Sequence, residues 1–221
     1  LSKWGEAGSG DGQLNGPSGI AFDSNDNLFV VDSQNGRIQE FTKEGKFLGK
    51  WGDQGTGDGQ LNLPWGICLD KEDNVYVADW KNNRVQKFTP DGKLLGKFQG
   101  TDGGVGDLHG PTGVAVDSEG DVYVTDWGNH RLQVYGPEGK FVTTLVGDAQ
   151  QPSPWTQTYI DANPDIIKAR RRADMEPEWR FHRPVAVNVD SQNRIIILES
   201  YRHRLQIYNK VKDYEEHSLN L

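Results

Sequence analysis

A seven-residue motif returns along this chain at a fixed interval, and that interval constrains the fold more than any other feature. Pro17-Ser-Gly-Ile-Ala-Phe-Asp23 recurs 47 positions later as Pro64-Trp-Gly-Ile-Cys-Leu-Asp70, and again as Pro111-Thr-Gly-Val-Ala-Val-Asp117. A fourth copy, Pro184-Val-Ala-Val-Asn-Val-Asp190, begins 73 positions after the third. A period in the forties that is carried by short apolar runs is typical of the blades of a β-propeller.

Each copy of the motif opens a run of four short segments with the pattern of β-strands. In the second copy, residues 65–70, 74–79, 84–88 and 93–98 alternate in polarity or are rich in β-branched and aromatic residues. Four antiparallel strands form one sheet with two apolar faces, so successive sheets must stack on each other. We therefore predict an all-β propeller as a single domain over residues 1–221, with four-stranded blades that begin near residues 17, 64, 111 and 184.

A charge pair is repeated together with the motif, around the turn between the second and third strands. In every copy an acidic residue precedes an arginine by five positions: Asp32 and Arg37, Asp79 and Arg84, Asp126 and Arg131, Glu199 and Arg204. A glutamine stands two positions after each arginine. Because a ligand site would not need to be rebuilt in every blade, we expect these pairs either to hold the turn between the second and third strands together or to link it to the neighbouring blade.

The combined pattern resembles the NHL-repeat β-propellers. The resemblance rests on the motif Pro-x-Gly-Ile/Val-Ala-x-Asp, on the strand Asn/Asp-Val-Tyr-Val-x-Asp, and most closely on Gly128-Asn-His-Arg-Leu-Gln-Val134. It covers residues 1–147 and 182–212. The fourth copy departs from it, since Ala186 replaces the motif glycine and Glu199 replaces the aspartate.

The resemblance also implies the size of the ring. NHL propellers usually have six blades, so this chain is expected to supply four blades of a ring completed by further sequence or by another chain. Leu1-Ser-Lys-Trp4 matches the end of a fourth strand, Leu48-Gly-Lys-Trp51, which places the start of the chain inside a preceding blade. The alternative is a small four-bladed ring, in which Leu1–Trp4 supplies an outer strand to the last blade.

Residues 148–182 form an insertion ahead of the fourth copy. Asn163-Pro164-Asp165 predicts the start of a helix that runs from Ile166 to Met175. The basic residues of the insertion are balanced by acidic ones, which favours a solvated helix face over a phosphate site. We expect its aromatic residues to anchor it on the propeller: Trp155, Tyr159, Trp179 and Phe181.

Composition limits the classes of function. The net charge of −8 would repel a phosphate backbone, which disfavours general binding of nucleic acids. The lone Cys68 lies in a strand pattern, where a buried small hydrophobic residue is expected rather than a nucleophile. No apolar run approaches the roughly 20 residues that span a bilayer. The sequence contains no Ser-His-Asp or glycine-rich phosphate motif, and we expect no cofactor.

The candidate site lies where the repeat varies. In a propeller, the loops between blades share one face, here called the top face, with the turns between second and third strands. Exposed aromatic residues there favour contact with a protein or peptide, centred over the second and third blades because the first blade has Ser18 and Ser33 instead. The predicted binding residues are Asn15, Asn62, His109 and His182 in the loops, Trp65 just after its loop, and Trp80, Trp127, His130, Tyr201 and His203 in the turns.

We therefore predict a non-catalytic scaffold that binds a protein or peptide on the top face, without a metal. One alternative is a metal-dependent lyase or hydrolase with His109 and His182 in the central channel, as in the related peptide-amidating lyases. Zinc catalysis needs about three protein ligands, yet the equivalent residues of the first two copies are Asn15 and Asn62. The second alternative is an RNA-binding NHL domain. The resemblance favours an extracytoplasmic setting.

Overall fold

The chain folds into a row of small β-sheets, each built from one repeat. The structure, a computed structural model, describes residues 3–100, 104, 106–148, 154–172 and 179–210. The first three repeats each form a four-stranded antiparallel sheet. Their strands are β3 (Pro17–Phe22), β4 (Leu28–Asp32), β5 (Arg37–Phe41) and β6 (Phe47–Trp51) in the first blade, β7 (Pro64–Leu69), β8 (Val75–Asp79), β9 (Arg84–Phe88) and β10 (Leu94–Phe98) in the second, and β11 (Pro111–Val116), β12 (Val122–Asp126), β13 (Arg131–Tyr135) and β14 (Phe141–Leu145) in the third.

The fourth repeat forms a sheet of three strands within the described residues, β15 (Pro184–Val189), β16 (Arg194–Glu199) and β17 (Arg204–Asn209). The fourth strand predicted for this blade would follow β17 and falls outside the described residues. Ahead of the first blade, β1 (Glu6–Ala7) pairs in parallel with β2 (Gln13–Leu14).

The second strands of the first three blades, β4, β8 and β12, are buried almost throughout. The second strand of the fourth blade, β16, has exposed residues. Every residue of β8 is buried, which explains why its sequence is a continuous apolar run rather than an alternating one. The turn before β8 is closed by Asp70, whose carboxylate accepts the backbone N–H groups of Glu72 at 3.1 Å and Asn74 at 2.9 Å. Asp73 in this turn has a φ of +60°, a conformation that Asp and Asn tolerate better than most residues.

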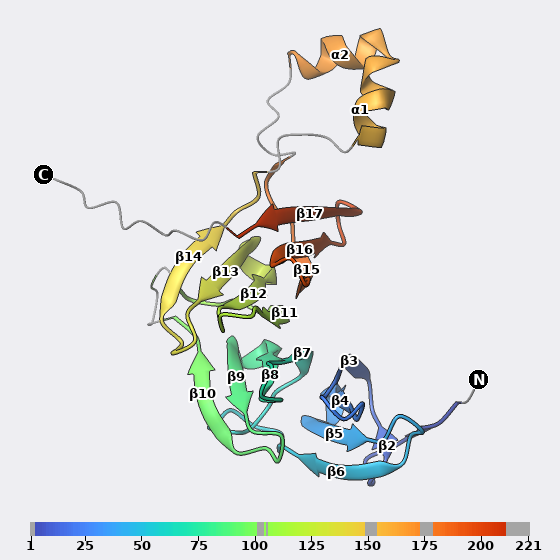
Figure 1. Ribbon diagram of the computed structural model, residues 1–221, viewed down its shortest axis with the longest axis vertical. Helices are drawn as coiled ribbons and strands as arrows, with labels where there is room; N and C mark the ends of the chain where they lie inside the picture. Colours follow the sequence, from blue (N-terminus) through green and yellow to red (C-terminus); the bar gives the residue numbers. More distant parts are fainter. Residues whose placement is uncertain (1–2, 101–103, 105, 149–153, 173–178, 211–221) are drawn as a thin grey trace, which may run out of the picture.

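The blades are arranged as an open arc. Their first strands, β3, β7, β11 and β15, pack against one another in chain order on the inner side of the arc. Figure 1 shows the arc running from the blue first blade to the red fourth blade, with the two end blades apart. The prediction that the motif segments form the innermost strands of propeller blades is confirmed.

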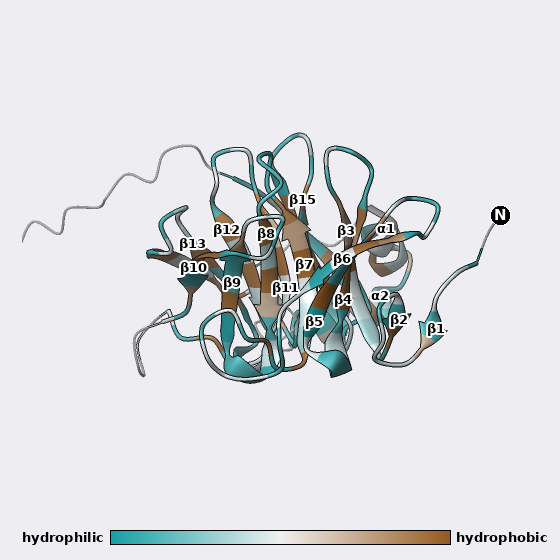
Figure 2. Cartoon of the chain, turned by 90° about the horizontal axis from the view of Figure 1, so that it is seen from below, coloured by the Kyte–Doolittle hydropathy of each residue, from teal (hydrophilic) through white to brown (hydrophobic). Residues whose placement is uncertain are grey.

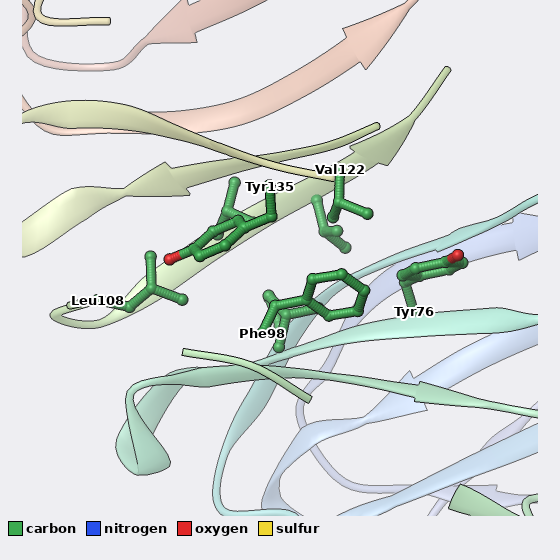
Figure 3. Close-up of a cluster of buried hydrophobic side chains, with 9 residues drawn as sticks. Tyr76, Phe98, Leu108, Val122 and Tyr135 are labelled. Carbon is green, nitrogen blue, oxygen red and sulfur yellow. The ribbon is translucent and has the colours of Figure 1, made fainter. Parts of the chain in front are cut away.

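The hydrophobic core is divided among the interfaces between blades. One cluster joins the first and second blades and includes Phe29, Ile38 and Ile67. The next joins the second and third blades around Tyr76 and Tyr135, with Phe98 between them, as Figure 3 shows. A third cluster joins the third and fourth blades. In Figure 2 the brown residues are concentrated in the strands and the connecting loops are largely teal, as stacked sheets require.

The alternative of a four-bladed ring closed by Leu1–Trp4 is wrong. The Trp4 ring packs on Phe41 of the first blade, with ring centroids 4.7 Å apart, instead of joining the last blade. Trp51 packs on Phe88 of the second blade in the same way, at 4.6 Å. An aromatic residue at the end of one repeat therefore packs on the third strand of the next repeat. By this contact Trp4 belongs with the first blade.

Both ends of the arc expose faces that are covered elsewhere. Ile20 on β3 is 63% exposed, whereas Ile67, its equivalent in the second blade, is 9% exposed. At the other end Leu205 on β17 is 59% exposed, whereas the equivalent Leu132 is fully buried. The described chain is thus part of a propeller whose end blades lack a neighbour.

The insertion contains two helices, α1 (Pro154–Asp161) and α2 (Pro164–Arg170), which stand apart from the sheets in Figure 1. Asn163 stands at the N-cap position of α2 without a side-chain capping bond, and Pro164 begins the helix, as predicted. The helix ends at Arg170, short of the predicted Met175, and residues 173–178 lie outside the described part. Phe181 is buried on Tyr208, with ring centroids 6.0 Å apart, as expected of an anchor. Tyr159 is 55% exposed, and its anchoring role stays a prediction. Within the described residues, neither helix is long and apolar enough to span a membrane.

Candidate functional site

Hydrogen bonds hold each inter-blade loop against a short 3₁₀ turn, and together these segments form the top face. The turns are η1 (Ser33–Asn35), η2 (Trp80–Asn82) and η3 (Trp127–Asn129). Each turn region donates a backbone N–H to a loop carbonyl: Gln34 to Asn15 at 3.0 Å, Lys81 to Asn62 at 3.1 Å, and Gly128 to His109 at 2.8 Å. The loop and turn residues predicted from the sequence therefore share one face.

The repeated charge pairs form the framework beneath this face. In the second blade Arg84 Nε donates to the fully buried Asp79 at 2.9 Å. Its Nη2 donates to the carbonyl oxygens of Gly57 at 2.7 Å and Gln60 at 2.8 Å, both in the inter-blade loop. Asp79 also accepts the backbone N–H of Asn62 at 2.7 Å. The pair thus fixes the path of the loop and satisfies its buried polar groups.

The same arrangement recurs in the other blades. Arg37 lies 2.7 Å from Asp32, Arg131 lies 2.8 Å from Asp126, and Arg204 pairs with Glu199. The prediction that these arginines lie within salt-bridge distance of an acidic residue is confirmed. The framework contacts the loops mainly through their backbone groups, with an additional ion pair of 3.9 Å between Arg84 and the loop residue Asp58.

A hollow of about 410 Å³ opens on the top face between the first and second blades. Trp65 forms one wall and is 47% exposed, and its ring centroid lies 6.2 Å from that of Trp80. The remaining lining comes from the loops and turn of the first two blades: Gly16, Pro17, Ser18, Ser33, Gln34 and Leu63. Trp80 itself is only partly exposed, and Lys81 Nζ lies 4.4 Å from the centre of its ring. The hollow combines two indoles with small polar side chains.

A second cluster lies on the top face between the third and fourth blades. The rings of His130 and His182 are stacked, with centroids 4.8 Å apart and an interplanar angle of 17°. The guanidinium of Arg183 lies 4.4 Å from the ring centre of Trp127 and 4.9 Å from that of Tyr201. Arg183 Nη1 donates to the hydroxyl of Tyr201 at 2.9 Å. We call these five residues the arginine cluster.

The environment of His130 disfavours its charged form. Partial burial lowers the pKa of His130, and the nearby His182 and Arg183 lower it further, against a smaller opposing effect of Asp126. The neutral ring also serves as an acceptor, since His130 Nδ1 receives the backbone N–H of Arg183 at 3.1 Å. The surroundings of His130 therefore favour its neutral form, beside the charged guanidinium of Arg183.

The other predicted site residues lie on the same face but outside the hollow and the cluster. Asn15, His109 and His203 are exposed, and Asn62 is half-buried. His109 lies against Gly128, whereas His182 stacks on His130. In the described part of the chain, no group of three or more His, Cys, Asp or Glu side chains could hold a metal ion.

Arg183 and Leu63, which stand at the same position of the repeat, were not among the residues predicted from the sequence. Gly16 and Gly110 fill this position in the first and third loops, with φ of +60° and +63°. Leu63 and Arg183 keep the same left-handed conformation, at +49° and +51°, although side chains disfavour it. The signal was present in the sequence, because a leucine and an arginine replace glycine at one fixed position of the repeat.

Comparison with known proteins identifies the repeat. A family model described as the NHL repeat matches residues 14–41, 61–88, 108–135 and 181–208, which together make up half of the chain. The chain belongs to the NHL repeat family. Among curated proteins, it is similar to Protein brain tumor of Drosophila melanogaster, with 47% identity over 45 residues. That match covers 20% of this NHL chain and 4% of the fly protein.

Solved structures agree with the propeller fold. A streptogramin B lyase structure superposes with a TM-score of 0.54 at 15% identity, over 90% of this chain and 56% of that one. A structural genomics protein of unknown function from Bacteroides thetaiotaomicron gives a TM-score of 0.61 at 20% identity, over 87% of this chain and 47% of that one. The NHL chain thus spans about half the length of these structures, and at such identities the likeness concerns the fold alone.

Proposed function

We propose that this NHL chain is a non-catalytic binding module that takes a segment of another protein on its top face. The observation that carries the proposal is the exposed Trp65 beside Trp80 over the hollow between the first two blades. Large exposed indoles are rare on surfaces without partners, and tryptophan is enriched among the residues that dominate binding energies. An apolar or aromatic side chain of a partner fits such a hollow.

The backbone supports the same assignment. Leu63 lines the hollow with a φ of +49°, where the equivalent residues of the first and third loops are glycine. Replacing glycine by leucine at this conformation costs about 1 kcal/mol. A residue held in a strained conformation at a surface hollow is more readily explained by contact with a ligand than by folding.

The arginine cluster gives the partner a second point of contact. Tyr201 is 57% exposed and Trp127 is partly exposed, so both are accessible on the same face as Trp65. We therefore infer that the partner extends from the hollow over the first two blades to the cluster over the third and fourth. The α2 helix stands away from the sheets in Figure 1 and is not part of this surface.

Selection from a library of short random peptides tests the proposal directly. The full chain is immobilised, peptides are enriched on it, and their affinities are measured by fluorescence anisotropy with the soluble chain. Replacing both Trp80 and Trp127 by Ala should weaken binding about tenfold or more, because truncation of central aromatic residues typically costs about 2 kcal/mol. Thermal unfolding checks that the variant remains folded.

A matched control separates the top face from general hydrophobic binding. Leu48 and Leu95 lie on the outer strands β6 and β10 and are 45% and 48% exposed. The double variant Leu48→Ala, Leu95→Ala should bind the same peptides with unchanged affinity. The proposal fails if no peptide is enriched, or if the leucine and tryptophan variants lose affinity equally.

A further inference from the structure

Arg183 is held in place by aromatic rings rather than by an acidic side chain. Its guanidinium lies over both Trp127 and Tyr201, at 4.4 and 4.9 Å from the ring centres, and one of its nitrogens donates to the Tyr201 hydroxyl at 2.9 Å. Stacked and hydrogen-bonded in this way, the side chain has lost much of its conformational freedom before any ligand arrives. It is a preorganised cation on the top face.

The charge of Arg183 is not compensated within the described part of the protein. The repeated arginines on this side of the blades pair with carboxylates, as Arg84 does with Asp79. No described acidic residue lies within ion-pair distance of Arg183, and the ionisable groups of its cluster are the histidines 130 and 182 and the Tyr201 hydroxyl.

Arg183 also occupies a position that does not favour arginine. Its φ is +51°, and glycine stands there in the first and third loops. The left-handed conformation costs a residue with a side chain about 1 kcal/mol or more. The sequence therefore places a cation at this point of the top face despite the backbone strain.

We propose that the arginine cluster binds a carboxylate of the partner, from an Asp or Glu side chain. This inference rests on the proposed function and names the chemistry of its second contact. The guanidinium offers Nε and Nη2, which form no hydrogen bond within the described residues, and a planar fork of this kind matches a carboxylate in two parallel bonds. Tyr201 accepts from Arg183, so its own hydroxyl hydrogen is left to donate to the same ligand.

A carboxylate suits this surface better than a nucleic-acid phosphate. A single carboxylate needs one local cation, whereas a polyanion gains affinity from many phosphate contacts and is repelled by a strongly acidic protein. The net charge of −8 therefore repels a polyanion along its whole length. It repels a single carboxylate side chain only weakly, because salt screens the more distant charges. With the indole hollow on the same face, the expected ligand combines one apolar and one acidic side chain.

The test compares an enriched peptide with its isosteric neutral twin, in which each Glu is replaced by Gln or each Asp by Asn. The wild-type chain should prefer the acidic peptide about tenfold or more, since hydrogen bonds to charged groups contribute about 1.5–3 kcal/mol. The variant Arg183→Gln should lose this preference while its affinity for the neutral twin changes little. Arg183→Lys should recover only part of it, because lysine lacks the planar fork.

The variant Arg202→Gln is the matched control, since it removes the same charge from the neighbouring turn and should leave the preference intact. Peptides that bind without any preference for acidic residues, with equal affinity for wild type and Arg183→Gln, would overturn the inference while the proposed function stands. If no peptide is enriched, the proposed function fails and the inference with it. Binding of a random-sequence single-stranded RNA that Arg183→Gln abolishes, in the absence of acidic-peptide binding, would overturn the inference in favour of the RNA alternative.

Discussion

His130 occupies the position that Asn83 holds in the preceding blade, and each of the two side chains accepts a backbone N–H from the next inter-blade loop. Asn83 Oδ1 accepts the backbone N–H of Gly110 at 2.9 Å, and His130 Nδ1 accepts that of Arg183 at 3.1 Å. Both residues have positive φ, of +53° and +56°, which suits the turn that ends each 3₁₀ segment. At the scale of single residues, the hydrogen bond between the turn and the next loop is thus conserved between these two blades. In the third blade, however, its acceptor is a titratable histidine.

This exchange predicts a pH dependence of stability. The pKa of His130 is lowered in the folded protein, so the unfolded chain binds a proton more readily. The contribution of His130 to stability is therefore full above its ordinary pKa of about 6.5 and is lost as the pH falls through the lowered pKa. Urea unfolding at about pH 7.5 and pH 5.5 should show a smaller loss of stability for His130→Asn than for wild type. An equal loss in both proteins would contradict this role.

At the scale of the blade element, the buried Asp–Arg pair connects the strands to the loop that enters the blade. In the second blade, Asp79 at the end of β8 and Arg84 at the start of β9 together bond the loop residues Gly57, Gln60 and Asn62. The loop has little apolar surface of its own, so these bonds replace a hydrophobic anchor. The repetition of the pair in every blade therefore reflects how each loop is held.

Removing one partner of the pair should destabilise the fold without a direct effect on binding. Arg84 is 5% exposed and Asp79 is fully buried, so Arg84→Ala would leave an unpaired buried carboxylate, at a cost of about 3 kcal/mol. Lys97→Ala removes the exposed partner of Asp58, 2.7 Å away, and should cost less than about 1 kcal/mol. Thermal unfolding measures both costs, and similar melting temperatures for the two variants would refute the structural role.

At the scale of the whole molecule, the blades depend on their neighbours for most of their buried surface. Each hydrophobic cluster lies between two blades, and the residues at the ends of the arc are exposed where their repeat equivalents are buried. Ile20 and Phe22 on the first blade, and Leu205 and Ile207 on the fourth, make up these end faces. The contribution of a side chain to the free energy of unfolding therefore depends on whether its blade lies inside the arc or at one end of it.

Two equivalent isoleucines test this dependence. Ile67→Ala removes a side chain that is 9% exposed and should cost about 2–4 kcal/mol in the free energy of unfolding. Ile20→Ala removes the same group at 63% exposure and should cost less than about 1 kcal/mol. Chemical denaturation of the chain at several protein concentrations gives both values. A similar cost at both positions would show that the first-blade face is covered in solution.

The sequence by itself determined the blade, because short strands joined by tight turns depend on local patterns. The period of the motif placed the inner strands, the alternation placed the others, and the spacing of Asp79 and Arg84 predicted their pairing. The packing of Trp4 was decided only by the tertiary structure, since its motif fits the end of any repeat and only contact with Phe41 assigns it to the first blade.

The site was determined only in part by the sequence. The repeat register put Trp65, Trp80 and the other predicted residues on one face, because equivalent positions of stacked blades share a side. The pairing of these residues into a hollow and a cluster depended on side chains reaching across blades, as Arg183 reaches Trp127 of the third blade. Such contacts join residues far apart in the chain, and periodicity carries no information about them, so only the three-dimensional structure could reveal them.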